Sequence, residues 1–219
     1  PPQAFHSQGV LPEDEASIDA NPLPYYLAMI ESLDTEMGRL VSTLSSTALD
    51  NTLIVFLGDN GSPREVIQPP YSSTQGKGSL YQGGIHVPMV ITGFGVEREG
   101  EIEDALITSV DLFSTFLNVA GQTVQESHDS QNFLPLLTSA GAATRSFNYT
   151  EHLTDRASQS GYTLRNITHK LIVFDNGNEA LYSLENDPYE NKNLLGASLT
   201  SVAQNAYNAL TTEAARIRQ

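Results

Sequence analysis

The chain has 219 residues and a formal net charge of −15, because 26 Asp and Glu residues outnumber 11 Lys and Arg residues. This length allows one hydrophobic core, or one core with a small subdomain. The acidic excess argues against a broad nucleic-acid surface, because neutralising phosphates requires clustered Lys and Arg. The sequence contains no cysteine, which excludes disulfides, Cys-ligated zinc and a Cys nucleophile within these residues.

Membrane and export signals are absent from the sequence. No apolar run approaches the roughly 18 residues of a spanning helix, so no membrane span is expected. Residues 1–22 are rich in Pro, Asp and Glu and predict a loop without a signal-peptide pattern. Since this start reads like the middle of a longer protein, the missing signal says nothing about export.

A long amphipathic helix is predicted from Pro22, with Asn21 as its cap. We expect it to end near Ser45 or Ser46. Apolar residues recur at steps of three and four and form one stripe, which predicts a face packed on a core. The stripe consists of Tyr26, Met29, Ile30, Leu33, Met37, Leu40, Val41 and Leu44.

Two strands are predicted next, at residues 53–57 and 87–91. The first is a wholly apolar run, typical of a parallel-sheet strand that is buried on both faces. Two strands are too few for a stable α/β sheet, which has about five or six. We therefore expect further strands upstream.

A second helix is predicted at residues 109–118, with Ser109 as its cap and Gly121 as its stop. Its periodicity places four apolar side chains toward a core. They are Leu112, Phe113, Phe116 and Leu117.

The pattern of predicted secondary structure changes near residue 144. Short β-rich segments separated by turn residues then predict an antiparallel sheet, followed by a final helix at 198–217. The chain is therefore divided into an α/β part at residues 1–144 and an antiparallel subdomain at residues 145–219. The predicted strands are residues 146–152, 162–168, 170–175 and 180–184, and the helix face comprises Val202, Ala206, Leu210, Ala214 and Ile217.

Asp59 and Asn60 directly follow the first predicted strand. Polar groups at the carboxyl end of such a strand lie where α/β sheets bind ligands. A carboxylate and an amide offer two hard oxygen ligands, which suit Ca²⁺ or Mg²⁺ better than zinc. A simple tight turn is the alternative for Asp-Asn-Gly.

Lys77 lies between Gly76 and Gly78, which would let a cation approach an anion closely. The upstream glycine of a P-loop is absent, and a solvated loop lysine is the alternative. His86 is a candidate ligand or acid–base group, or a structural histidine. Asp111 could contact a positive group, although an interaction with the helix dipole is the simpler interpretation.

These motifs, in this order, resemble the C-terminal portion of the sulfatase family within the alkaline-phosphatase superfamily. The resemblance runs from about residue 23 to 195. It rests on the helix with Gly38-Arg39-Leu40, on Gly58-Asp59-Asn60-Gly61, on Lys77-Gly78-Ser79-Leu80-Tyr81-Gln82-Gly83-Gly84, on Ser109-Val110-Asp111-Leu112 and on the closing motif from Leu181 to Glu190 with Asn193-Leu194.

The resemblance implies an α/β fold: part of a mixed or parallel sheet flanked by helices, then a small antiparallel sheet with a helix. It implies that Asp59 and Asn60 ligate Ca²⁺ and that Lys77 contacts the sulfate and its leaving oxygen. The family's nucleophile, a formylglycine, would lie upstream of this chain. Gln82 and His86 depart from the family pattern, which often has Glu and Arg there.

The implied function is hydrolysis of a sulfate ester on a small molecule or carbohydrate, together with the N-terminal half of the same enzyme. This chain alone is expected to be inactive, and a periplasmic or secreted location is suspected from the resemblance. Two alternatives remain: a phosphodiesterase or phosphonate hydrolase with the same fold, and a non-catalytic truncated module. The enzymatic reading requires the Lys77 ammonium to share a hollow with Asp59 and Asn60.

Overall fold

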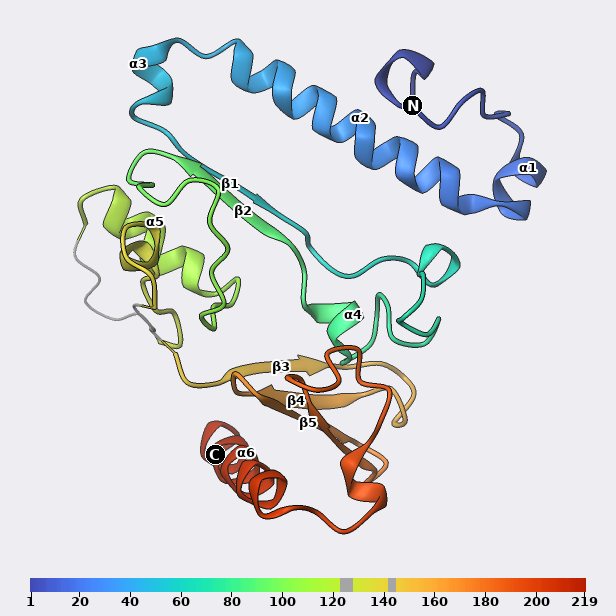
Figure 1. Ribbon diagram of the computed structural model, residues 1–219, viewed down its shortest axis with the longest axis vertical. Helices are drawn as coiled ribbons and strands as arrows, with labels where there is room; N and C mark the ends of the chain where they lie inside the picture. The colour runs from blue at the N-terminus through green and yellow to red at the C-terminus, as the bar shows by residue number, and fades with distance from the viewer. Residues whose placement is uncertain (123–127, 142–144) are drawn as a thin grey trace.

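A computed structural model describes residues 1–122, 128–141 and 145–219 of the chain (Figure 1). A two-stranded sheet with helices forms the first part, and a four-stranded sheet with one long helix forms the second. The helices are α1 (Glu15–Ala20), α2 (Pro22–Ser42), α3 (Ser46–Leu49), α4 (Gln82–Ile85), α5 (Asp111–Val119) and α6 (Ser201–Ile217). The strands are β1 (Leu53–Leu57), β2 (Met89–Gly93), β3 (Asn148–His152), β4 (Gly161–Arg165), β5 (His169–Phe174) and β6 (Glu179–Ser183).

Helix α2 begins at Pro22 as predicted, but the Asn21 side chain makes no capping hydrogen bond. It ends at Ser42, earlier than expected, and the short α3 follows. Within the described residues the predicted apolar stripe is only partly covered, because half of its members are half-buried and the other half are exposed. Its exposed members include Met29, Ile30, Leu33 and Leu40, each 47–54% exposed.

Strands β1 and β2 pair antiparallel, with Val55 opposite Ile91. This corrects the expected parallel relationship and moves the second strand from 87–91 to 89–93. The chain turns back after β1, and the backbone N–H of Gly58 donates to the carbonyl of Pro88 at 3.0 Å. Burial on both faces is also wrong for this chain: β1 is half-buried throughout, and Val90 on β2 is 60% exposed.

Helix α5 exposes part of the face that the sequence predicted to be buried, whereas Leu112 and Leu117 on that face are half-buried. Phe113 and Phe116 are 54% and 46% exposed, whereas Ser114 and Thr115 are buried. Hydrogen bonds explain why this polar face is buried: the backbone N–H of Ser114 donates to the Ser130 hydroxyl, and the Thr115 hydroxyl accepts the N–H of Phe133. The helix starts at Asp111 with Val110 in the capping position, so Ser109 is not its cap. Gly121 follows its end at a φ of 71°, as expected for a stop.

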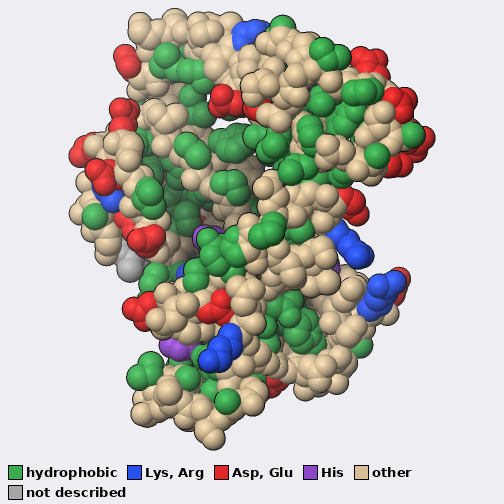
Figure 2. Space-filling view, turned by 45° about the vertical axis from the view of Figure 1, so that its right-hand side comes forward, with side chains coloured by type: hydrophobic (Ala, Val, Ile, Leu, Met, Phe, Trp, Pro, Cys, Tyr) green, Lys and Arg blue, Asp and Glu red, His purple; other side chains and the backbone are tan. Residues whose placement is uncertain are grey.

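The apolar faces of α2, β2 and α5 leave hydrophobic side chains at the surface of the first part. Figure 2 shows such side chains gathered around a hollow in the upper half of the molecule. No helix within the described ranges combines the length and apolar character that crossing a bilayer demands.

The four strands β3, β4, β5 and β6 lie in that order and pair antiparallel, which confirms the predicted sheet. Helix α6 covers one face, as seen at the bottom of Figure 1. The predicted face of α6 is partly wrong, because Val202 is 68% exposed and Ala203 is buried in its place. The core between sheet and helix consists of Leu164, Leu171, Leu181, Ala203, Leu210 and Ala214.

The other face of this sheet packs against the segment that follows Lys77. Alternation along β5 directs Leu171 toward α6 and Ile172 away from it. Ile172 joins Leu80 and Tyr182 in a second buried cluster. The sheet therefore serves as a platform for the candidate site, as the position of α4 above β3 in Figure 1 also indicates. The predicted boundary at residue 144 falls outside the described residues, and the division at that point stays a prediction.

Candidate active site

The loop with Asp59 and Asn60 lies against the segment with Lys77, held by backbone hydrogen bonds. The N–H of Lys77 donates to the carbonyl of Ser62 at 2.9 Å, and the N–H of Gly61 donates to the carbonyl of Gly84 at 2.9 Å. Residues 76–84 thus run beside the turn that follows β1. The structure therefore brings together the two stretches of chain that the sequence singled out.

Glycines make this close approach possible. A Cβ at Gly61 would lie 1.8 Å from the carbonyl oxygen of Gly83, and a Cβ at Gly76 would lie 2.6 Å from that of Ser62. Any side chain at these positions would push the two segments apart. Backbone packing thus explains Gly61 and Gly76, whereas Gly78 has a φ of 78° and open space where a Cβ would lie.

The three predicted site residues have uncommitted polar groups. Within the described part of the chain, Asp59, Asn60 and the Lys77 ammonium have no side-chain hydrogen bond or ion pair. Asp59 and Lys77 are exposed and Asn60 is half-buried. Two oxygen ligands at one turn fit part of a Ca²⁺ site, which takes six to eight oxygens. No group of three or more His, Asp or Glu side chains is arranged to hold a metal in the ranges described.

His86 ends α4 beside positive groups of the C-terminal sheet. Desolvation by the surrounding protein lowers its pKa although the residue is partly exposed, and the charges of Arg165 and Lys170 lower it further. The neutral imidazole is therefore favoured near neutral pH.

Asp111 makes a contact with a positive group, which was the less favoured interpretation of the sequence. Its buried carboxylate pairs with the Arg145 guanidinium and accepts the backbone N–H groups of Thr108 and Gln131, each at 2.8 Å. These bonds tie the start of α5 to the beginning of the C-terminal part. The residue is structural and lies apart from the site residues in its contacts.

Sequence reasoning missed the residues that attach the stretch from Gln75 to Gln82, called the Lys77 segment from here on, to the C-terminal sheet. The buried Gln75 donates through Nε2 to the carbonyls of Tyr189 and Glu190. The N–H of Gln82 donates to the Glu190 carboxylate, which also pairs with Lys170 at 2.7 Å. The closing motif that ends in Glu190 was visible in the sequence, but its contact with residues about a hundred positions earlier was not.

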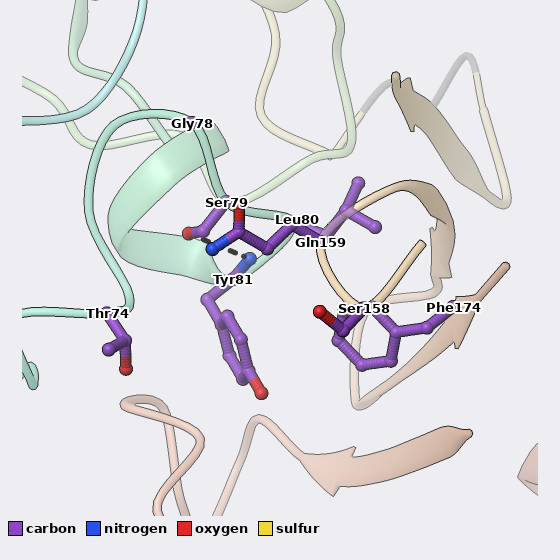
Figure 3. Close-up of a pocket in the computed structure, with 8 residues that line it drawn as sticks. All are labelled: Thr74, Gly78, Ser79, Leu80, Tyr81, Ser158, Gln159 and Phe174. Atoms are coloured by element: carbon purple, nitrogen blue, oxygen red, sulfur yellow. Dashed lines mark hydrogen bonds between the residues drawn. The ribbon is translucent and has the colours of Figure 1, made fainter. Parts of the chain in front are cut away.

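A pocket of about 250 Å³ opens between the Lys77 segment and the C-terminal sheet (Figure 3). Hydroxyl and amide groups and two aromatic rings line it, with Tyr81 and Phe174 on its two sides. The N–H of Tyr81 is directed at the Ser79 hydroxyl at 3.4 Å. The lining residues are Thr74, Gly78, Ser79, Leu80, Tyr81, Ser158, Gln159 and Phe174.

Comparison with known families agrees with this arrangement. The family model described as Sulfatase matches residues 1–122, and the model described as N-sulphoglucosamine sulphohydrolase, C-terminal, matches residues 75–216. This chain belongs to the sulfatase family. Its two matches overlap across the Lys77 segment, where the two parts of the fold meet.

Several proteins of this family are similar in sequence. The chain is 27% identical over 184 residues to arylsulfatase K of Xenopus laevis, covering 78% of this chain and 33% of that protein. It is 27% identical over 183 residues to N-acetylglucosamine-6-O-sulfatase of Bacteroides thetaiotaomicron, covering 78% and 31%. The sulfatase chain described here thus spans about a third of the length of these curated relatives.

Solved structures show the same fold. The structure of BT4656 in complex with its substrate, D-glucosamine-2-N,6-O-disulfate, matches with a TM-score of 0.72 and 25% identity, over 87% of this chain and 40% of that one. The phosphonate monoester hydrolase of Silicibacter pomeroyi matches with a TM-score of 0.72 and 23% identity, over 89% and 40%. The second likeness concerns the fold alone. The expected α/β fold with a C-terminal antiparallel sheet and helix is confirmed.

Proposed function

We propose that this chain is the C-terminal part of a calcium-dependent sulfatase that hydrolyses sulfate esters on a carbohydrate. The observation that carries the proposal is the backbone pairing of the Asp59-Asn60 turn with the Lys77 segment. The pairing supports the proposal because, in a chain of the sulfatase family, it brings a turn with a carboxylate and an amide next to a stretch with a lysine.

Asp59 and Asn60 would supply two of the oxygens around Ca²⁺. A carboxylate and an amide oxygen are hard ligands, which favour calcium over zinc. Bound Ca²⁺ would offset the negative charge of the sulfate oxygens as the ester is cleaved. The upstream formylglycine implied by the family resemblance would supply the nucleophile.

Lys77 would contact the sulfate group and stabilise the leaving oxygen. Its ammonium is exposed and forms no ion pair within the described ranges. No existing ion pair therefore has to break before it binds an anion. Charge stabilisation of this kind acts most strongly where charge develops in the transition state.

A sulfated sugar is the substrate class that we favour. One relative is named for N-acetylglucosamine 6-O-sulfate, and a structural neighbour is bound to a disulfated glucosamine. The pocket beside Gly78 and Ser79 offers hydroxyl and amide groups with the Phe174 ring, a combination that suits a sugar. A periplasmic or secreted location would match such a substrate.

The exposed apolar faces of α2, β2 and α5 would contact the N-terminal half of the enzyme. Patches of this kind on a protein surface mark contact sites. We therefore expect residues 1–219 alone to release no sulfate from an aryl sulfate, and measured turnover by this chain would overturn that expectation.

The direct test is an assay of the full-length protein with 4-nitrophenyl sulfate and with 6-O-sulfated glucosamine. We expect sulfate release that a chelator abolishes and that Ca²⁺, but not Zn²⁺, restores. Release of phosphate or phosphonate from matched esters, without sulfate release, would favour the phosphoryl-transfer alternative. Inactivity toward all these esters in the presence of Ca²⁺ would favour the non-catalytic one.

A further inference from the structure

Glu190 sits in a tight turn at the end of the closing motif. Its backbone has a φ of 57°, a left-handed conformation that is uncommon for a residue other than glycine. The turn is fixed by Asp187, whose carbonyl accepts the N–H of Glu190 at 3.1 Å and whose carboxylate accepts the N–H of Lys192 at 2.8 Å. The turn thus directs the Glu190 side chain into the protein, where it is fully buried.

Glu190 contacts both ends of the Lys77 segment. At one end the Glu190 carbonyl accepts Nε2–H of Gln75 at 3.2 Å. At the other, Oε2 of Glu190 accepts the backbone N–H of Gln82 at 2.5 Å. Lys77 lies between these two attachments, on a glycine-flanked stretch that has no regular secondary structure.

The charges around Glu190 explain why a carboxylate stands there. Lys170 on β5 lies directly opposite Arg165 on β4, so two cations share the sheet face that supports the segment. Oε1 of Glu190 pairs with Nζ of Lys170 at 2.7 Å, and both side chains are fully buried. Like charges opposite one another destabilise a sheet, and an unpaired buried charge is costly, so the carboxylate offsets both effects.

Charge balance alone would not require Glu190. Well-packed apolar residues replace many buried ion pairs without loss of stability. An apolar pair would, however, leave the N–H of Gln82 without its acceptor. The property of Glu190 that matters for the site is therefore its carboxylate oxygen, which accepts the backbone N–H of Gln82.

We propose that Glu190 is a positioning residue that holds the segment from Gln75 to Gln82 against the C-terminal sheet and thereby fixes Lys77 over the substrate. The inference rests on the proposed function for the role of Lys77. The attachment of this segment to the sheet, called the clamp below, rests only on the contacts of Glu190 and Gln75. Small misplacements of a catalytic group are enough to slow a reaction by about 100-fold.

Two double variants of the full-length protein separate the acceptor from the charges. Lys170→Met/Glu190→Gln removes both charges and keeps an acceptor for Gln82, whereas Lys170→Met/Glu190→Leu removes the acceptor as well. We expect the first to keep kcat for an aryl sulfate within about threefold of wild type. We expect the second to lose kcat by about tenfold or more, with KM changed by less than about twofold.

Hydrogen–deuterium exchange gives a readout that does not depend on activity. Exchange of residues 75–84 should rise in the Glu190→Leu double variant and stay near wild type in the Glu190→Gln one. Gln75→Met offers a second test that leaves the buried charges intact, in case the Leu variant does not fold. It should also raise exchange across the segment and lower kcat.

A buried pair elsewhere provides the matched control. Asp111→Asn/Arg145→Met should lower the melting temperature without raising exchange at 75–84 or lowering kcat at a temperature where the protein is folded. The proposal is overturned if the Leu variant and Gln75→Met keep wild-type exchange, if raised exchange leaves kcat unchanged, or if the control loses as much kcat. If the wild-type protein shows no sulfatase activity, the proposed function fails, and the exchange contrast still decides whether the clamp exists.

Discussion

The two parts of this chain differ in how completely they bury their own apolar residues. The C-terminal sheet and α6 enclose a core in which Leu164, Leu181 and Leu210 are fully buried. In the first part, Leu33 on α2 and Phe113 on α5 are each about half exposed. The contrast teaches that the C-terminal part covers one face of its sheet with its own helix, whereas the first part presents faces suited to a partner surface.

The Lys77 segment lies at the junction of these two parts. Its backbone is bonded to the Asp59-Asn60 turn on one side, and its flanking Gln75 and Gln82 are bonded to Glu190 on the other. The site residues in the less covered part are therefore held by the better packed one. This arrangement gives a physical role to a C-terminal motif that contributes no proposed ligand.

The largest expected effect tests the contrast in burial itself. Leu171→Ala should destabilise residues 1–219 by about 2–5 kcal/mol, because it opens a cavity in the platform core. Leu33→Ala in the same chain should cost less than about 0.5 kcal/mol, because the side chain is 48% exposed. Urea unfolding measures both changes.

The same Leu33→Ala substitution in the full-length protein sharpens this prediction. If the α2 stripe is covered there, its cost should rise to about 2 kcal/mol or more. An equally small cost in both proteins would contradict the idea that the first part presents a contact face.

Lys77→Ala tests the junction. We expect kcat of the full-length protein for an aryl sulfate to fall by about 100- to 1,000-fold, because the charge on the leaving oxygen loses a stabilising partner. Lys192→Ala, a change at an exposed lysine of the C-terminal part, serves as the control and should leave kcat unchanged. Equal kcat values for the two variants would remove Lys77 from the proposed mechanism.

The platform should also respond to alkaline pH. Burial, opposed by Glu190, lowers the pKa of Lys170 to about 8 from its ordinary 10.5. The unfolded chain then binds more protons than the folded one between these values, so the contribution of Lys170 to stability rises with pH in that window. Below about pH 8 the penalty for burying the ammonium is present in full.

Urea unfolding between about pH 8 and pH 9.5 checks this sign. The free energy of unfolding of the wild-type chain should rise relative to that of Lys170→Met/Glu190→Gln, by at most about 1.4 kcal/mol per pH unit. A relative fall across this window would show that the ammonium is stabilised by its burial site.

The smallest effect concerns the pocket. Phe174→Ala should raise KM for a sulfated glucosamine several-fold by removing one aromatic wall, and leave turnover of a small aryl sulfate within about twofold. Parallel assays of the two substrates measure the split. Equal losses on both would indicate damage to the junction and no contact with the sugar.

Local patterns in the sequence predicted the elements well, and long-range contacts poorly. Periodicity located α2, and β-rich segments between turn residues located the four antiparallel strands. The turn requirement of Gly121 was also predicted correctly. The antiparallel direction of β2 was missed, because the apolar run of β1 is typical of a parallel strand, whereas here it belongs to a half-buried antiparallel pair. The buried face of α5 was missed because its polar residues bond to Ser130 and to the backbone of Phe133.

The candidate site shows the same limit. Asp59, Asn60 and Lys77 were singled out by residue type and by glycine neighbours, and the structure brings their backbone segments together. Whether they bind calcium and sulfate stays a prediction. Glu190 was invisible as a partner, because a contact across 108 residues leaves no spacing pattern.

The most direct measurement is a crystal structure of the full-length protein with a sulfated glucosamine, recorded with the anomalous signal of calcium. The account predicts a calcium peak about 2.3–2.6 Å from side-chain oxygens of Asp59 and Asn60, and the Lys77 ammonium within about 3 Å of a sulfate oxygen. A metal bound elsewhere, or a Lys77 side chain extended into solvent away from the sulfate, would contradict it.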